Sequence, residues 1–483
     1  MSSIRKNFLF NSILTISNYI FPIIVFPYIT RVLGVHNIGI CNFIDSIIQY
    51  FILFSFLGMQ TMATREIAKV KDDSQKLSKT FISLLTINIC TTVIALVILF
   101  FTAIAIPKFQ DYKTLLLIGS SKIVANTLLV EWFFVGTENF KYITVRSIVI
   151  RFFYVISVFV FVKESSDYIL YFTLTMLMFV VNAFINIVYV RKYVKFSLEG
   201  IEITKYLKPF FTLGAYQLLT SMYTSFNVAY LGFVSGETEV GYYTVATKIY
   251  SILLGVFTAF TSVMLPRMSS LIEQGNINEF KQKISGSVDV LLCFCMPVIV
   301  MATMYAPTII RIAAGVGYEG SIIPLQIITP LMLIIGYEQI LVLQVLTPLN
   351  KDRAVLINSL VGATIGILLN ILLVRSYGRI GSSVVWIISE ISVLLMAQFF
   401  VSRFIQMHFP FKKYIKYITS SIPAFFLCWI IMNSLNSDVW SFIISSFVIC
   451  LYFFTIYAFV IKNEHVLYFI GKINQFKLRN NKR

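Results

Sequence analysis

Long apolar runs separated by short polar segments dominate the chain of 483 residues. Each run approaches or exceeds the roughly 20 residues that a helix needs to cross a bilayer. The runs are apolar on all sides, whereas the strands of a membrane barrel alternate apolar and polar residues. The pattern therefore predicts an all-α membrane protein with about fourteen transmembrane helices. They are expected at residues 9–30, 40–60, 81–104, 114–135, 143–162, 169–190, 209–231, 241–264, 285–306, 321–345, 354–374, 382–402, 417–435 and 440–461.

Basic residues collect in alternate loops between these runs. With the N-terminus inside, 29 Lys and Arg residues fall in inside segments and seven in outside segments. Because cytoplasmic loops of membrane proteins accumulate Lys and Arg, both termini are expected in the cytoplasm. The same bias accounts for the net charge of +17, so no nucleic-acid partner is expected.

An internal repeat relates the first span to a segment 202 residues later. Gly34 and Gly39 recur as Gly236 and Gly241, and 8 of 52 aligned positions are identical between residues 28–79 and 230–281. Together with the similar order of spans and basic loops, this predicts a duplication of six spans. The basic loop 191–208 divides the two copies, and the last two spans lie outside them.

The repeat divides the chain into three predicted parts. Residues 1–200 form an N-terminal lobe of six helices, and residues 201–408 form a C-terminal lobe of six more. Residues 409–483 add two extra C-terminal helices and a basic cytoplasmic tail.

Two prolines interrupt the first span. Pro22 and Pro27 each remove a backbone donor and crowd the preceding turn, so the helix is expected to bend or unwind there. Because freed carbonyls inside a membrane need water or a partner, the bend should face a cavity and change during transport. Gly34 and Gly39 are expected to reverse the chain beyond it.

Ionisable residues inside the spans are functional candidates, because each costs about 2.5–3.5 kcal/mol to insert. Several deep cations around one water-filled cavity would suit an anionic ligand. Structural ion pairing and snorkelling to the membrane surface are the alternatives. The cations are Arg31, Lys122, Arg146, Arg151 and Lys248.

A second set of candidates is acidic. These residues either bind a coupling proton or sodium ion or pair with the cations, and the sequence leaves both readings open. They are Asp45, Glu131, Asp289, Glu338 and Glu390.

Motifs of enzyme and cofactor chemistry are missing from the sequence. There is no phosphate-binding Gly-x-x-x-x-Gly-Lys-Ser/Thr loop and no His-Glu-x-x-His metal motif. The six cysteines lie in or beside apolar runs, which is typical of buried small residues. We therefore expect no metal, no cofactor and no enzymatic activity, with an enzyme of lipid-linked sugars as the minority alternative.

Three stretches together resemble the Wzx-type polysaccharide flippases. The second of them is the most specific, although the family usually has Asp where Glu131 stands. The stretches are Phe26–Gly34 followed by Gly39, Glu131–Arg146, and a third region containing Thr347–Lys351, Asn370–Val374, Gly378–Gly381 and Glu390.

The resemblance implies a superfamily that also contains MATE-type drug extruders and lipid II flippases. It implies two six-helix lobes around a central cavity, related by a parallel internal repeat. The substrate implied is an undecaprenyl-pyrophosphate-linked oligosaccharide repeat unit of an O-antigen or capsule. It would cross the bacterial inner membrane from the cytoplasmic to the outer face. A polysaccharide polymerase and a chain-length regulator are candidate partners.

Two other transport functions remain as alternatives. A MATE-type extruder of drugs or cations would line its cavity with acids and aromatics. A flippase for lipid II or a teichoic-acid precursor would differ only in the head group that it binds. The sequence does not indicate whether a proton or a sodium gradient drives transport.

Overall fold

The computed structural model describes residues 3–197, 201–224, 226–464 and 466–467, and all regular structure within them is helical. The contacts divide the chain into two compact units. The first comprises residues 1–244, 314–317 and 370–382, and the second comprises residues 245–313, 318–369 and 383–483.

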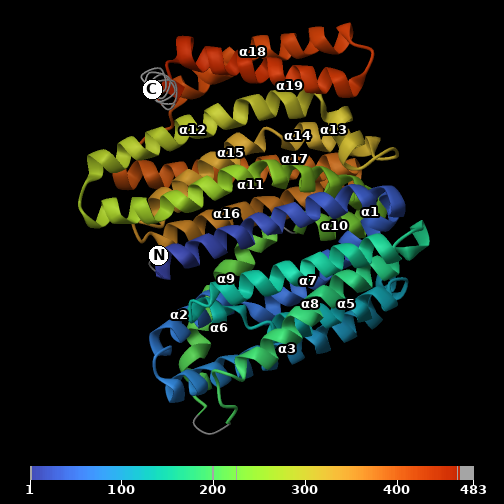
Figure 1. The fold of residues 1–483 in the computed structure, drawn as a ribbon, viewed down its shortest axis with the longest axis vertical. Helices are drawn as coiled ribbons and strands as arrows, with labels where there is room; N and C mark the ends of the chain where they lie inside the picture. Colours follow the sequence, from blue (N-terminus) through green and yellow to red (C-terminus); the bar gives the residue numbers. More distant parts are fainter. Residues whose placement is uncertain (1–2, 198–200, 225, 465, 468–483) are drawn as a thin grey trace, which may run out of the picture. The chain divides into compact units, whose positions relative to one another are not determined.

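Helices α1 to α10 all belong to the first unit (Figure 1). Within it α1 packs along α3, α5 and α7, and α5 packs along α8. The bounds are α1 Ser3–Phe56, α2 Met59–Val70, α3 Ser74–Ala105, α4 Pro107–Gln110, α5 Lys113–Leu128, α6 Glu131–Gly136, α7 Phe140–Phe161, α8 Tyr168–Val190, α9 Ile203–Thr224 and α10 Phe226–Ser235.

Most later helices belong to the second unit. Helix α11 begins in the first unit and continues into the second, and the π-helical segment η4 with the start of α17 belongs to the first. The bounds are α11 Glu237–Glu273, α12 Ile277–Met304, α13 Ala306–Ala313, α14 Ile322–Ile328, α15 Leu331–Gln339, η3 Ile340–Leu346, α16 Asp352–Leu369, η4 Asn370–Val374, α17 Arg375–Ile405, α18 Phe411–Ser434, α19 Asp438–Thr455 and η5 Ile456–Ile461.

Ten helices in the described part of the chain are long and apolar enough to cross a membrane, or eleven if one bent pair is counted. Two of them, at residues 9–70 and 352–405, each contain two of the predicted spans. The bent pair, with 45° between its halves, covers the predicted span 321–345, and α9 with α10 covers 209–231. The all-helical membrane fold is confirmed, and the count of fourteen stays a prediction.

Helix α1 breaks at a glycine rather than at its prolines. The backbone stays helical through Pro22 and Pro27, so the helix does not unwind there, and a bend at the prolines stays a prediction. The non-helical residue is Gly34, with φ 74° and ψ 169°, a conformation that residues with a Cβ avoid. The hydroxyl of Thr30 and the guanidinium of Arg31 donate to carbonyls one turn earlier, at 2.9 and 2.6 Å, and so add hydrogen bonds around Pro27. A movement of this helix during transport stays a prediction.

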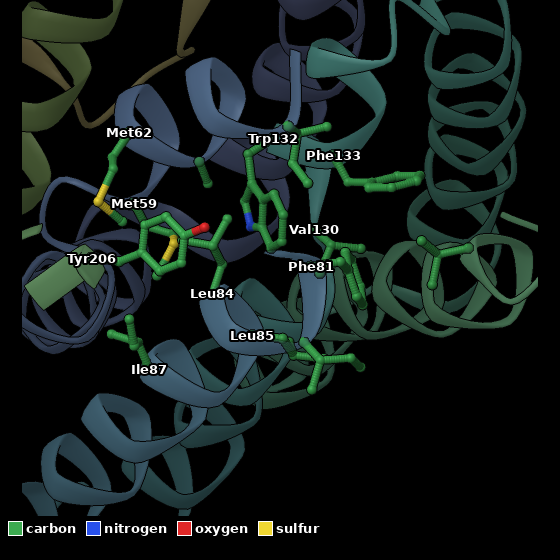
Figure 2. Close-up of a cluster of buried hydrophobic side chains, with 14 of the residues drawn as sticks. Met59, Met62, Phe81, Leu84, Leu85, Ile87, Val130, Trp132, Phe133 and Tyr206 are labelled. Atoms are coloured by element: carbon green, nitrogen blue, oxygen red, sulfur yellow. The ribbon is translucent and has the colours of Figure 1, made fainter. Parts of the chain in front are cut away.

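A cluster of buried side chains holds the short helix α6 in place (Figure 2). Trp132, Phe133 and Phe134 of α6 are fully buried. The ring of Phe81 in α3 lies 5.3 Å from the rings of both Trp132 and Phe133. Because such aromatic side chains bury large apolar areas, this packing fixes where α6 begins, at Glu131.

The two C-terminal helices pack against each other and against α12 in the second unit (Figure 1). The buried hydroxyl of Tyr305 lies 2.8 and 2.5 Å from the hydroxyls of Ser441 and Ser445 in α19. Phe411 and Ile422 on α18 are 66% and 62% exposed, which gives this helix an apolar face suited to lipid.

Candidate functional site

Lys122 lies buried in α5 and is neutralised by an acid from α1. Its Nζ is 2.6 Å from Oδ1 of Asp45, and it also lies 4.9 Å from the centre of the Phe179 ring. The lysine side chain is 9% exposed and the Asp45 side chain 42%, so the pair is open on the acid's side. The structure thus brings together one predicted cation and one predicted acid.

Arg146 and Glu131 form a second pair, which involves the family-like stretch. Nη2 of Arg146, a buried residue of α7, lies 2.8 Å from Oε1 of Glu131. The Arg146 guanidinium also donates to the Asn186 side chain, whose amide in turn donates to the carbonyl of Leu129. Val130, in the left-handed region at φ 39°, turns the chain between α5 and α6 and so presents Glu131 to this network.

Arg151 has a different environment from the two paired cations. It is half-buried in α7, and its Nη1 donates to the hydroxyl of Ser17 in α1 at 2.7 Å. Among the described residues, no carboxylate lies within ion-pair distance of it, although Glu131 is near enough for its charge to act on Arg151. Arg151 is therefore a cation of an apolar helix that no carboxylate of the described residues neutralises.

The remaining predicted cations lie in different units. Arg31, three residues before the α1 break, is exposed, and its side chain passes close to Gly315 of the same unit. Lys248 is half-buried in the part of α11 that belongs to the second unit. Their convergence on one cavity with Arg151 stays a prediction.

Three predicted acids lie in the second unit. Oδ2 of Asp289 in α12 is 2.6 Å from Nζ of Lys413 in α18. Glu390 of α17 is buried and accepts a hydrogen bond from Nε1 of Trp386 at 3.0 Å. Glu338 of α15 is half-buried and near enough to Glu390 for their charges to repel. Among the residues described, neither Glu338 nor Glu390 forms an ion pair with a cation.

The first glycine of each repeat has positive φ at a helix junction. Gly34 has φ 74° at the α1 break, and Gly236 has φ 92° between α10 and α11. Gly39 and Gly241, five residues later, lie within helices. The reversal expected at Gly39 therefore does not occur, because that residue serves close packing instead.

Equivalent residues of the repeat contact each other reciprocally within the first unit. A Cβ on Gly39 would lie 1.8 Å from the carbonyl oxygen of Glu237, and one on Gly241 would lie 2.2 Å from that of Val35. Reciprocal contact of this kind is what a twofold relation produces. We call this region of α1 and α11 the glycine contact.

Two ion pairs flank the glycine contact, and neither was predicted from the sequence. Lys108 pairs with Glu237 at 3.0 Å, and Arg379 pairs with Glu239 and also donates its backbone N–H to that carboxylate at 2.8 Å. Both cations were counted only as outside loop charges. The sequence feature that could have predicted these pairs is the presence of two acids in the first turn of the helix after Gly236. The N-terminus of a helix favours negative charge.

No group of three or more metal-ligating side chains occurs in the described ranges of the chain. The candidate site is therefore a set of charged residues in apolar helices together with the glycine contact. Such a set can bind a charged group.

Comparison with known proteins identifies the family. The profile of the polysaccharide biosynthesis protein family matches residues 4–272, which is more than half of the chain. The chain belongs to this family. The predicted resemblance to polysaccharide flippases is thereby confirmed.

Curated proteins similar to this chain have names that agree with this family. The "Putative O-antigen transporter" of Escherichia coli (strain K12) is 26% identical over 404 residues, which cover 83% of this chain and 97% of that protein. The protein of the same name from Shigella dysenteriae is 26% identical over 401 residues, covering 81% and 98%. The chain thus belongs to a transporter family of polysaccharide biosynthesis.

Solved structures share the fold. The lipid II flippase MurJ in an inward closed conformation superposes with a TM-score of 0.79 at 18% identity, covering 94% of this chain and all of that one. An inward-facing multidrug transporter of the MATE family gives 0.64 at 12% identity, covering 80% and 94%. At such low identity these likenesses establish the membrane-transporter fold alone.

Proposed function

We propose that this protein flips undecaprenyl-pyrophosphate-linked oligosaccharide repeat units from the cytoplasmic to the outer face of the bacterial inner membrane. Arg151, a half-buried cation in an apolar helix of a polysaccharide-family transporter, is the observation that carries this proposal. A pyrophosphate and its sugars cannot cross hydrocarbon unaided, because desolvating charged and polar groups is costly. A cation in a wet cavity offsets part of that cost while the lipid tail stays in the bilayer.

Charge favours this function over extrusion of cationic drugs. Among the candidate ionisable residues of the first unit there are four cations and two acids, and two of the cations are neutralised by those acids. Arg151, which has no carboxylate within ion-pair distance among the described residues, then supplies positive charge for a phosphate, with Arg31 and Lys248 as further predicted contributions. A site for cationic drugs would have the opposite balance.

The mechanism that we propose is alternating access, in which two repeat-related lobes expose one cavity to either side. The glycine contact would close the outer end, because positive-inside topology puts the start of α11 there. It would have to separate for the sugars to leave. No nucleotide hydrolysis is required, and a proton or sodium gradient would act through Glu338 and Glu390.

The proposal is tested by replacing Arg151. In cells that depend on this protein for surface polysaccharide, Arg151→Ala should reduce export at least tenfold, and Arg151→Lys should restore part of it because the charge is retained. Lys141→Ala, which removes an exposed cation from the same helix, should leave export unchanged. Normal export in Arg151→Ala at normal protein level would count against the proposal.

A further inference from the structure

A cavity of about 730 Å³ with several charged lining residues lies within the second unit, and Asp289 is the one lining residue that is also a candidate for transport. It lies between the end of α11, the first turns of α12 and α18, and the end of η5. The segments around it, 265–284 and 403–416, are rich in Lys and Arg, and Lys462 follows η5. Because such segments face the cytoplasm, the cavity lies at the cytoplasmic surface of the membrane.

The charges around this cavity are unevenly neutralised. The Lys413 ammonium is held by Asp289 at 2.6 Å and by the Ser285 hydroxyl at 2.8 Å. Glu279 also lines the cavity, and its carboxylate is held at 2.8 Å by Arg267, which does not line it. These contacts neutralise the carboxylates of Asp289 and Glu279, and they fix Lys413 in the wall of the cavity.

Three further lysines line the cavity against one remaining acid. Lys283, Lys416 and Lys462 face no carboxylate within ion-pair distance among the described residues, and Glu464 is the acid. The Lys416 ammonium donates to the carbonyl of Ile461 at 3.1 Å, which ties α18 to the end of η5. The wall therefore carries an excess positive charge at the membrane surface.

A buried hydroxyl adds a second, independent feature. Ser287 lines the cavity, is 2% exposed, and its Oγ has no hydrogen-bond partner among the residues that the structure describes. A buried polar group without a partner costs free energy, so a ligand that accepts its hydrogen bond would be stabilised there. A hydroxyl and ammonium groups around one cavity are the donors that a phosphate oxygen needs.

Apolar surface beside the cavity indicates the rest of the ligand. Phe459 and Val460, which precede the cavity-lining Ile461, are 75% and 59% exposed, and Ile415 beside Lys416 is 59% exposed. A free phosphate would not use such a surface, whereas acyl chains would cover it. Basic pockets between helices on the cytoplasmic side suit anionic lipid head groups.

We propose that this cavity binds the phosphate head group of an anionic phospholipid of the inner leaflet, with its acyl chains along α18 and η5. Lys283, Lys416 and Lys462 attract the phosphate, and Ser287 donates a hydrogen bond to it. The lipid would join the C-terminal helices to α12. The inference depends on the membrane fold and is independent of the substrate that is transported.

Native mass spectrometry of the purified full-length protein tests this inference, with phosphatidylglycerol and phosphatidylcholine of identical acyl chains as probes. The wild type should bind phosphatidylglycerol more tightly. Lys283→Gln/Lys416→Gln should lose about fivefold in affinity per lysine. The control Lys281→Gln/Lys412→Gln removes the same charge from the same two helices outside the cavity, and should lose less than twofold.

Ser287→Ala provides a variant that leaves every charge in place. It should weaken phosphatidylglycerol binding severalfold without changing the binding of phosphatidylcholine. An equal loss of phosphatidylglycerol affinity in the lysine control would show general electrostatic attraction and overturn the proposal. Unchanged binding in both cavity variants would also overturn it. Displacement of the lipid by millimolar inorganic phosphate would show a site for free phosphate and would equally overturn it.

Discussion

The glycine contact makes a sharp prediction about the conformational cycle. In Gly39→Ala the new methyl carbon would lie 1.8 Å from the carbonyl oxygen of Glu237 and 2.6 Å from its carbonyl carbon. Both obstacles are backbone atoms, so no side-chain rotation relieves the clash and the helices must separate. Overpacking of this kind costs about 1–3 kcal/mol, which lowers the population of the closed contact by about 5- to 150-fold.

Disulfide cross-linking measures that population directly. His36 and Thr238, which are equivalent in the repeat, lie side by side with Nδ1 and Oγ1 3.2 Å apart. His36→Cys/Thr238→Cys, in a background without the six native cysteines, should cross-link rapidly under mild oxidant. Adding Gly39→Ala should slow that reaction at least fivefold.

Gly119→Ala is the matched control for overpacking in the same unit. Its methyl group would meet the side chain of Ile48, at 2.7 Å from Cγ1, and so overpacks the unit without touching the backbone of α11. The cross-linking rate should therefore remain that of the parent. If Gly39→Ala folded normally and cross-linked as fast as its parent, the close approach of α1 and α11 would not be a feature of the protein in the membrane.

Three further predictions concern individual charges. Asp45→Asn should lower the free energy of unfolding by about 2 kcal/mol because it leaves the buried Lys122 unpaired. Adding Lys122→Met should recover most of that loss, and thermal unfolding in detergent measures both changes. Hydrogen bonds from backbone N–H groups and the ammonium of Lys76 lower the pKa of Asp73, which caps α3, below its ordinary value of 3.8. The stability that Asp73 contributes should thus be complete above pH 4 and lost as the pH falls through the lowered pKa. Over that pH range, hydrogen exchange of the first α3 amides should accelerate in the wild type but not in Asp73→Ala. Glu390→Gln should make flipping in vesicles insensitive to an imposed proton or sodium gradient, and an undiminished response to both would exclude Glu390 as the coupling group.

The helices could be predicted from the sequence because each apolar run must satisfy its own backbone groups in lipid. The repeat could be predicted from its glycines: in the structure Gly34 and Gly236 both have positive φ, and Gly39 and Gly241 make reciprocal contacts. The position of the α1 break was not predictable from the prolines alone. A helix can lose a backbone donor at a proline and remain helical, whereas a residue with a Cβ rarely adopts positive φ. The break therefore lies at a glycine.

The pairing of the charges could not be predicted because it depends on packing between distant helices. Lys122 and Asp45 are 77 residues apart, and Lys413 and Asp289 are 124 apart. Both members of the first pair were candidate residues from the sequence, but their pairing was not predicted. In the second pair, Lys413 was expected only to be a charge of an inside loop.

The most direct test of the proposed function is flipping by the purified protein in vesicles. An undecaprenyl-pyrophosphate-linked oligosaccharide labelled on its sugar would be placed in both leaflets, and a sugar-cleaving enzyme added outside would report the accessible fraction. We expect that fraction to rise from about half to nearly all in vesicles that contain the protein, and to remain at about half with Arg151→Ala. Cleavage that stopped at half with the active wild-type protein would contradict the account.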